Sequence, residues 1–135
     1  MKKFITLALV FIMCVFAISC ADADGGKMLY EEDTVLGDGN TTIIFAVEHF
    51  DGKMVTFTIK TDKTVLSDAL LEHELIEGEN DIYGLYVKKV NGITQDFNKD
   101  RTYWALYVNG EYSMEGVSSI EITEGAIYTY KASTY

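Results

Sequence analysis

The 135-residue chain has 21 Asp and Glu against 11 Lys and Arg, a formal net charge of −10 at pH 7. A surface this acidic repels phosphate backbones, so nucleic acid is not expected as a partner. The chain contains no proline, which leaves Gly and Asn to mark its turns. Its length suits one small domain with a single core.

The first twenty residues have the pattern of an export signal. Lys2 and Lys3 precede an apolar run, residues 4–18, which is shorter than the roughly 20 residues that span a bilayer. Residues 1–19 are therefore expected to be a signal peptide. The motif Ala17-Ile18-Ser19-Cys20 resembles the lipobox of bacterial lipoproteins, although Ala17 stands where that pattern usually has Leu.

The lipobox resemblance implies that Cys20 is lipidated and becomes the first residue of the mature chain. The protein would then be anchored to the cell membrane on its extracytoplasmic face, because two acyl chains suffice for stable attachment. The alternative is an ordinary cleaved signal in which Cys20 has no special role.

Residues 20–40 are expected to be the lipidated cysteine and a flexible acidic tether. This segment is rich in glycine and acidic residues and has few apolar side chains. The folded domain is expected to occupy residues 41–135.

The domain is predicted to begin with a β-hairpin. Apolar residues alternate in both strands, and a three-residue loop at residues 50–52 pairs Val47 with Val55 and Phe45 with Phe57. Gly52 would then take a left-handed conformation. This register collects one apolar face and leaves the other face polar.

After the hairpin the apolar period lengthens to nearly four. Thr64 is predicted to cap a helix that ends near Gly78. Further strands are predicted at residues 83–90, 103–108 and 126–132. These elements predict an α+β domain, a β-grasp-like antiparallel sheet of about five strands with one helix packed on it.

Catalytic and metal-binding patterns are weak. No nucleophile stands in a motif with the two histidines, so no enzymatic activity is expected. His73 and Glu77 supply only two ligands for a metal ion. Residues 96–100 imitate half of a calcium loop, but Arg101 and Tyr107 occupy positions where that loop needs Gly and Glu. A polar turn is the favoured interpretation.

The most informative segment is residues 103–112. If Asn109-Gly110 is a two-residue turn, Tyr107 faces Tyr112 and Ala105 faces Met114. The residues predicted to form one face are Tyr103, Tyr107, Tyr112 and Met114. Such a face suits a flat organic ligand or a protein partner, and it is equally well explained as core.

Three segments carry a family resemblance: Gly84-Leu85-Tyr86-Val87-Lys88-Lys89-Val90-Asn91-Gly92, Tyr103-Trp104-Ala105-Leu106-Tyr107-Val108-Asn109-Gly110 and Gly116-Val117. In combination they resemble the transcobalamin-like C-terminal domain family, bacterial domains of unknown function. The similarity spans about residues 41–132. In the vitamin B12 carriers of animals, the similar domain is the smaller lid that closes over the corrin ring against a large helical domain.

The resemblance implies a non-enzymatic small-molecule binding module, with cobalamin or another corrinoid as the candidate ligand. The expected ligand-binding residues are the four of the predicted face together with Tyr86. We expect a separate partner to complete the site, because the chain has no room for the helical domain. The alternative is a module for protein–protein interaction or adhesion in the cell envelope.

Overall fold

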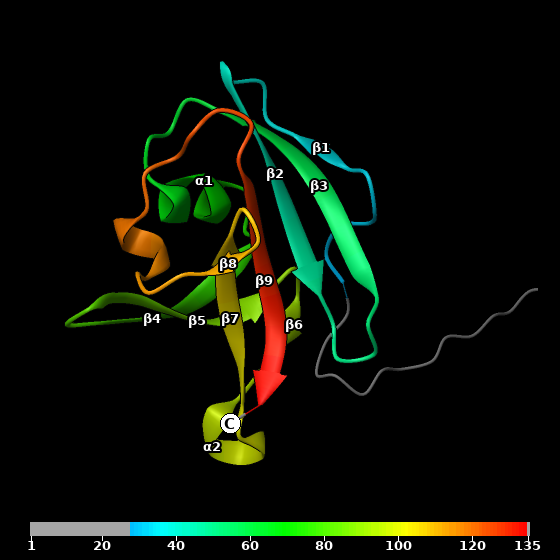
Figure 1. Cartoon of the computed structure of the whole chain (residues 1–135), viewed down its shortest axis with the longest axis vertical. Helices are drawn as coiled ribbons and strands as arrows, with labels where there is room; N and C mark the ends of the chain where they lie inside the picture. The colour runs from blue at the N-terminus through cyan, green and yellow to red at the C-terminus, as the bar shows by residue number, and fades with distance from the viewer. Residues whose placement is uncertain (1–27, 135) are drawn as a thin grey trace, which may run out of the picture.

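The computed structural model describes residues 28–134. The predicted signal peptide, residues 1–19, and Cys20 lie outside these residues. The elements in chain order are β1 (Val35–Leu36), β2 (Thr41–Glu48), β3 (Met54–Thr61), α1 (Leu66–Glu72), β4 (Ile76–Asp81), β5 (Gly84–Val90), β6 (Ile93–Thr94), α2 (Phe97–Asp100), β7 (Thr102–Val108), β8 (Glu111–Tyr112), the 3-10 turn η2 (Val117–Ser119) and β9 (Ile127–Thr134). The predicted α+β class is confirmed (Figure 1).

The strands of the described region form two sheets. One has six strands in the order β1-β3-β2-β9-β7-β8, and the other has three in the order β4-β5-β6. The prediction of one antiparallel sheet of about five strands was wrong. β9 pairs with β2 in parallel, as β1 does with β3, because long connections allow parallel neighbours that a hairpin cannot make.

The opening hairpin has the predicted register. Val47 pairs with Val55 and Phe45 with Phe57, and Gly52 has a φ of 89°. The register holds because sliding one strand by a single residue would turn its apolar side chains to the opposite face.

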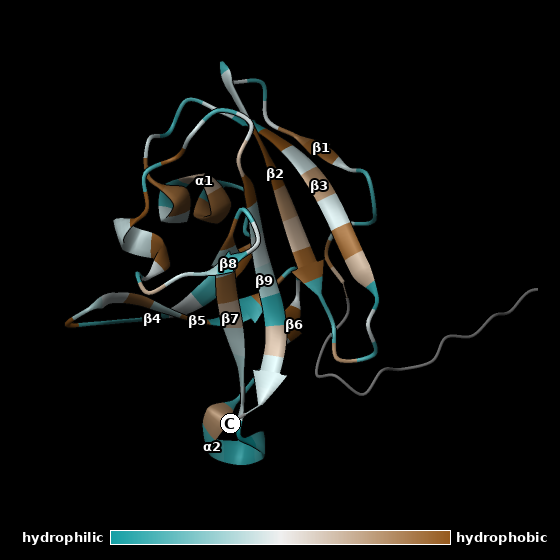
Figure 2. Ribbon diagram, in the orientation of Figure 1, coloured by the Kyte–Doolittle hydropathy of each residue, from teal (hydrophilic) through white to brown (hydrophobic). Residues whose placement is uncertain are grey.

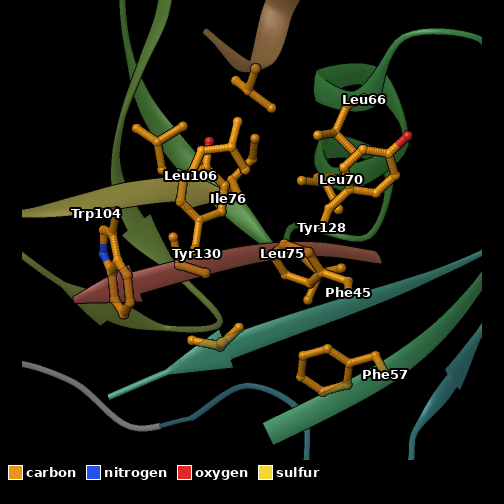
Figure 3. Close-up of a cluster of buried hydrophobic side chains, with 14 of the residues drawn as sticks. Phe45, Phe57, Leu66, Leu70, Leu75, Ile76, Trp104, Leu106, Tyr128 and Tyr130 are labelled. Carbon is orange, nitrogen blue, oxygen red and sulfur yellow. The ribbon is translucent and has the colours of Figure 1, made fainter. Parts of the chain in front are cut away.

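One face of the six-stranded sheet forms the core together with α1 and the three-stranded sheet. Figure 1 shows these elements on the same side of the large sheet, and apolar segments of α1 and the strands are brown in Figure 2. The rings of Phe45 and Phe57 stack with their centroids 6.1 Å apart, and the Phe45 ring meets the Tyr130 ring edge-on, also with 6.1 Å between centroids. Leu66 and Leu70 of α1 lie beside Tyr128 in the same cluster of buried side chains (Figure 3).

The helix prediction was partly wrong. α1 ends at Glu72, with His73 as its C-cap and Glu74 in a left-handed conformation at a φ of 58°. Thr64 does not cap it, since the N-cap is Val65 without a side-chain hydrogen bond. Gly78 lies at a β-bulge inside β4, where a Cβ would overlap the carbonyl oxygen of Tyr86.

The described part of the expected tether, residues 28–40, packs against the domain. The Tyr30 ring meets Phe57 edge-on at 6.1 Å, and its hydroxyl donates to the His73 carbonyl at 3.0 Å. β1 adds a short parallel strand beside β3, and Asp33 N–H donates to the Thr56 carbonyl at 2.7 Å. These contacts cover the edge of β3, so the folded region begins before residue 41.

Candidate ligand-binding face

The candidate site lies on the outward face of the six-stranded sheet, opposite the core. Side chains alternate across a sheet, so the residues between the core positions of each strand share this face. Strand pairing aligns them in rows. One row is Tyr112, Tyr107, Thr129, Ala46 and Thr56, and the next is Ala105, Lys131, Glu48 and Met54.

The two rows form a trough. Ala46 and Ala105 are small and are 4% and 3% exposed, so larger neighbouring side chains cover them. Tyr107 stands on the β7 side of the two rows and Met54 on the β3 side. An open hollow of about 280 Å³ results. Its lining residues are Glu48, Met54, Tyr107, Gly110, Thr129 and Lys131.

The predicted turn at Asn109-Gly110 is present and aligns two of the predicted site residues. Tyr107 pairs with Tyr112, and their rings meet edge-on at 5.6 Å. Asn109 adopts a φ of 51° and Gly110 a φ of 90°, as a tight hairpin turn requires. Tyr112 is 54% exposed, so this aromatic pair is open to solvent rather than part of the core.

The other predicted site residues lie in different surroundings. Tyr103 is on the outward face of β7, where it pairs with Ser133 and is half-buried. Met114 lies beyond β8 and is 89% exposed, and the pairing of β7 with β8 ends at Tyr107 and Tyr112, so it does not extend to Ala105 and Met114. Tyr86 belongs to β5 of the three-stranded sheet and is not on this face. The structure therefore places Tyr103, Tyr107 and Tyr112 on one face and brings Tyr107 and Tyr112 into contact.

The core side of the same strands has a separate role. Trp104 and Leu106 alternate with the tyrosines along β7 and are 6% and 7% exposed. The Trp104 indole N–H donates to the Ile93 carbonyl at 3.2 Å, and His49 meets the indole edge-on at 6.4 Å. The hydrogen bond ties the large sheet to strand β6, and the buried indole lies on the core side, away from the trough.

Two of the residues considered for metal binding, Asp96 and Glu77, interact with other groups of the protein. The Asp96 carboxylate accepts the N–H groups of Asn98 and Lys99 and so caps α2. Glu77 lies in β4, with its carboxylate 3.8 Å from the Lys89 ammonium. Between residues 28 and 134, no group of three or more His, Cys, Asp or Glu side chains is arranged to hold a metal ion.

Sequence reasoning missed four residues that line the trough: Glu48, Met54, Thr129 and Lys131. The alternation of the opening hairpin places Glu48 on a polar face, which was a usable signal. Nothing in the sequence indicates that β9 inserts between β2 and β7, and this insertion brings the four residues beside Tyr107.

Residues 62–127 match the family described as a domain of unknown function, DUF4430. The DUF4430 segment begins just after β3 and ends at the first residue of β9, so it includes all five tyrosine and methionine positions predicted for the site. The hairpin residues that complete the trough lie outside it. No curated protein sequence matches the chain.

Two crystal structures share the fold that contains the DUF4430 segment. A protein from Ruminococcus gnavus ATCC 29149, provisionally named as metal binding, aligns with a TM-score of 0.67 and 23% identity, over 70% of this chain and 98% of that one. Haptocorrin in complex with Cbi aligns with a TM-score of 0.53 and 24% identity, over 70% of this chain. The match covers 25% of the haptocorrin chain. At these identities the likeness shows a shared fold alone.

Proposed function

We propose that this protein is a non-enzymatic binding module whose outward sheet face takes a flat small molecule, with a corrinoid as the first candidate. The observation that carries the proposal is the trough, an open hollow bordered by the ring of Tyr107, against which the exposed ring of Tyr112 packs. Tyrosine suits such a surface because it offers a large apolar ring and a polar hydroxyl. The shared fold with haptocorrin in complex with Cbi supports testing corrinoids first.

The shape of the trough limits how a ligand is held. Ligand pockets typically have volumes of about 300–1,000 Å³ and cover most of their ligand. The hollow of about 280 Å³ is open, so it contacts one side of a ring and leaves the other side uncovered. We propose that a separate partner covers that second side, and we expect the isolated domain to bind weakly.

Calorimetric titration of residues 21–135 with cobinamide tests the proposal. We expect Tyr107→Ala and Tyr112→Ala each to weaken binding by at least about fivefold, which corresponds to about 1 kcal/mol for a contact residue of a binding site. The matched control is Tyr83→Ala, because Tyr83 is 83% exposed and lies outside the trough. Thermal melting of each variant reports whether the fold is intact.

Two outcomes would contradict this function. One is the absence of any binding heat at millimolar cobinamide. The other is binding that survives both trough substitutions and is lost with Tyr83→Ala. Contact quenching of Trp104 is not a suitable readout, because its indole is buried on the core side of the sheet.

We also propose that the protein is a lipoprotein, anchored to the membrane through Cys20 on the extracytoplasmic face. Support comes from the sequence pattern before Cys20, which lies outside the described residues. Within residues 28–134, no helix is long and apolar enough to cross a membrane. Incorporation of radiolabelled palmitate that persists in a Cys20→Ser variant would refute the anchor.

The second candidate function is protein–protein interaction or adhesion. It is favoured by two large apolar residues at the β4–β5 turn, Ile82 and Tyr83, which are 87% and 83% exposed. The Tyr83 N–H donates to the Asp81 carboxylate at 2.8 Å, which orders this turn. This function predicts a co-purifying protein that is lost with Ile82→Ser but retained with Tyr107→Ala, and the reverse pattern would reject this turn as the contact.

A further inference from the structure

The trough contains one cation and one anion as direct neighbours. Glu48 of β2 is paired with Lys131 of β9, and both side chains lie on the outward face. Both line the hollow beside Tyr107 and Thr129. Glu48 is half-buried and Lys131 is exposed, so both polar groups are within reach of a bound ligand.

The two charges cancel locally. Their sum is zero, in a chain whose formal net charge is −10. Within residues 28–134, no carboxylate lies within 4.0 Å of the Lys131 ammonium, whereas Lys88 and Lys89 do have such partners at 3.3 and 3.8 Å. The trough thus presents a strong donor and a strong acceptor side by side.

This arrangement discriminates among ligand classes. A carboxylate ligand would gain from Lys131 but would meet Glu48 and the negative field of the whole chain. A cationic ligand would gain from Glu48 but would be repelled by Lys131. A neutral group that both donates and accepts can satisfy both residues at once, since the ammonium only donates and the ionised carboxylate only accepts.

We infer that the trough selects ligands bearing a neutral primary amide beside a flat ring, with the amide carbonyl accepting from Lys131 and the amide N–H donating to Glu48. The inference rests on the proposed function, because it assigns the chemical class of ligand for the same face. The hydroxyls of Tyr107 and Thr129 supply further neutral donors and acceptors around the pair.

The test compares three corrinoids that share one ring: cobyrinic acid, its amide and its methyl ester. The ester keeps the carbonyl acceptors but has no N–H donor, and the acid is anionic at pH 7. Equilibrium dialysis against residues 21–135 is expected to show that the amide binds most tightly, the ester less tightly and the acid least tightly. We expect the amide to bind about tenfold more tightly than the ester, because hydrogen bonds to charged groups are the stronger kind.

Variants assign the discrimination to the pair. Glu48→Met should remove most of the preference for the amide over the ester, since the acceptor for the amide N–H is lost. Lys131→Met should weaken both ligands, because both use the carbonyl. Lys53→Met is the matched control, since Lys53 is exposed in the β2–β3 loop and does not line the trough.

The outcomes separate this inference from the proposed function. Equal binding of amide and ester, or tightest binding of the acid, overturns the inference and leaves corrinoid binding intact. An amide preference that is unchanged in Glu48→Met also overturns it. Binding of none of the three corrinoids overturns the inference and also contradicts the corrinoid form of the proposed function.

Discussion

Tyr30 provides a direct test of whether the segment before residue 41 belongs to the fold. A flexible tether would make Tyr30 irrelevant to stability. In the structure its hydroxyl donates to the His73 carbonyl at 3.0 Å, and its ring meets Phe57 at 6.1 Å with an interplanar angle of 76°. Its backbone N–H and carbonyl also pair with the Asn91 side chain, at 2.8 and 3.1 Å.

Two substitutions divide these contributions. Tyr30→Phe removes one hydrogen bond to a partly buried carbonyl, which typically costs about 0.5–1 kcal/mol. Tyr30→Ala also removes the ring, and truncating a fully buried large aromatic costs about 3–5 kcal/mol. Because Tyr30 is only half-buried, we expect about 2 kcal/mol for Tyr30→Ala, of which the edge-on pair with Phe57 is a part.

Urea denaturation and thermal melting of residues 21–135 measure the effect. A loss of about 1 kcal/mol lowers the Tm of a domain this small by about 4–8 °C. We therefore expect a Tm lower by about 8–16 °C for Tyr30→Ala and by about 2–8 °C for Tyr30→Phe. Tyr83→Ala, at an exposed position, is the control and should change little. If Tyr30→Ala has the same Tm as Tyr83→Ala, residues 28–40 do not pack against β3 and the reasoning fails.

Two further predictions concern stability. Gly78→Ala should destabilise the domain by about 1–3 kcal/mol in urea denaturation, because the new Cβ would overlap the Tyr86 carbonyl. Gly116→Ala is the control and should be nearly neutral, because the space around Gly116 is open. Equal effects of the two substitutions would contradict the bulge geometry. Burial raises the pKa of Tyr130 well above its ordinary value of 10.0. As the pH rises above about 10, Tyr130 ionises in the unfolded chain while it stays protonated in the folded protein. The free energy of unfolding should therefore fall above this pH, by up to about 1.4 kcal/mol per pH unit. Comparing urea midpoints of wild type and Tyr130→Phe between pH 9 and pH 11 checks this, and an equal slope in both proteins would refute it.

The sequence predicted the parts of the fold that local chemistry determines. The hairpin of β2 and β3 could be registered because only a three-residue loop collects Phe45 and Phe57 on one face, and Gly52 permits the positive φ that this loop needs. The pairing of Tyr107 with Tyr112 followed from Asn109-Gly110 in the same way. In both places the turn residues and the alternation of side chains along the strands indicate the same register.

The errors arose where tertiary contacts override local signals. β4 has the sequence Ile-Glu-Gly-Glu-Asn-Asp, which has no apolar alternation, and it forms a strand because β5 pairs with it. α1 stops four residues before Ile76, because Leu75 and Ile76 turn into the core instead of continuing the helix. Residues 28–40 look like a linker by composition but cover an open strand edge.

Only part of the candidate site could be predicted, because some of its residues become neighbours only through tertiary contacts. Its tyrosines lie close together in the chain, so turn register could align them. Glu48 and Lys131 are 83 residues apart in the numbering, and only the parallel pairing of β2 with β9 makes them neighbours. Periodicity reports which face a side chain takes within a strand, but it does not report which strands are adjacent.

The most direct test of a ligand-binding sheet face is a chemical-shift titration. Isotope-labelled residues 21–135 would be titrated with cobinamide and followed by the backbone amides of both sheets. We predict that the largest shifts occur at Tyr107, Thr129 and Lys131 and at the facing residues Ala46 and Glu48. Shifts confined to the β4–β5 turn, or none at millimolar ligand, would contradict the assignment of this face as the binding site.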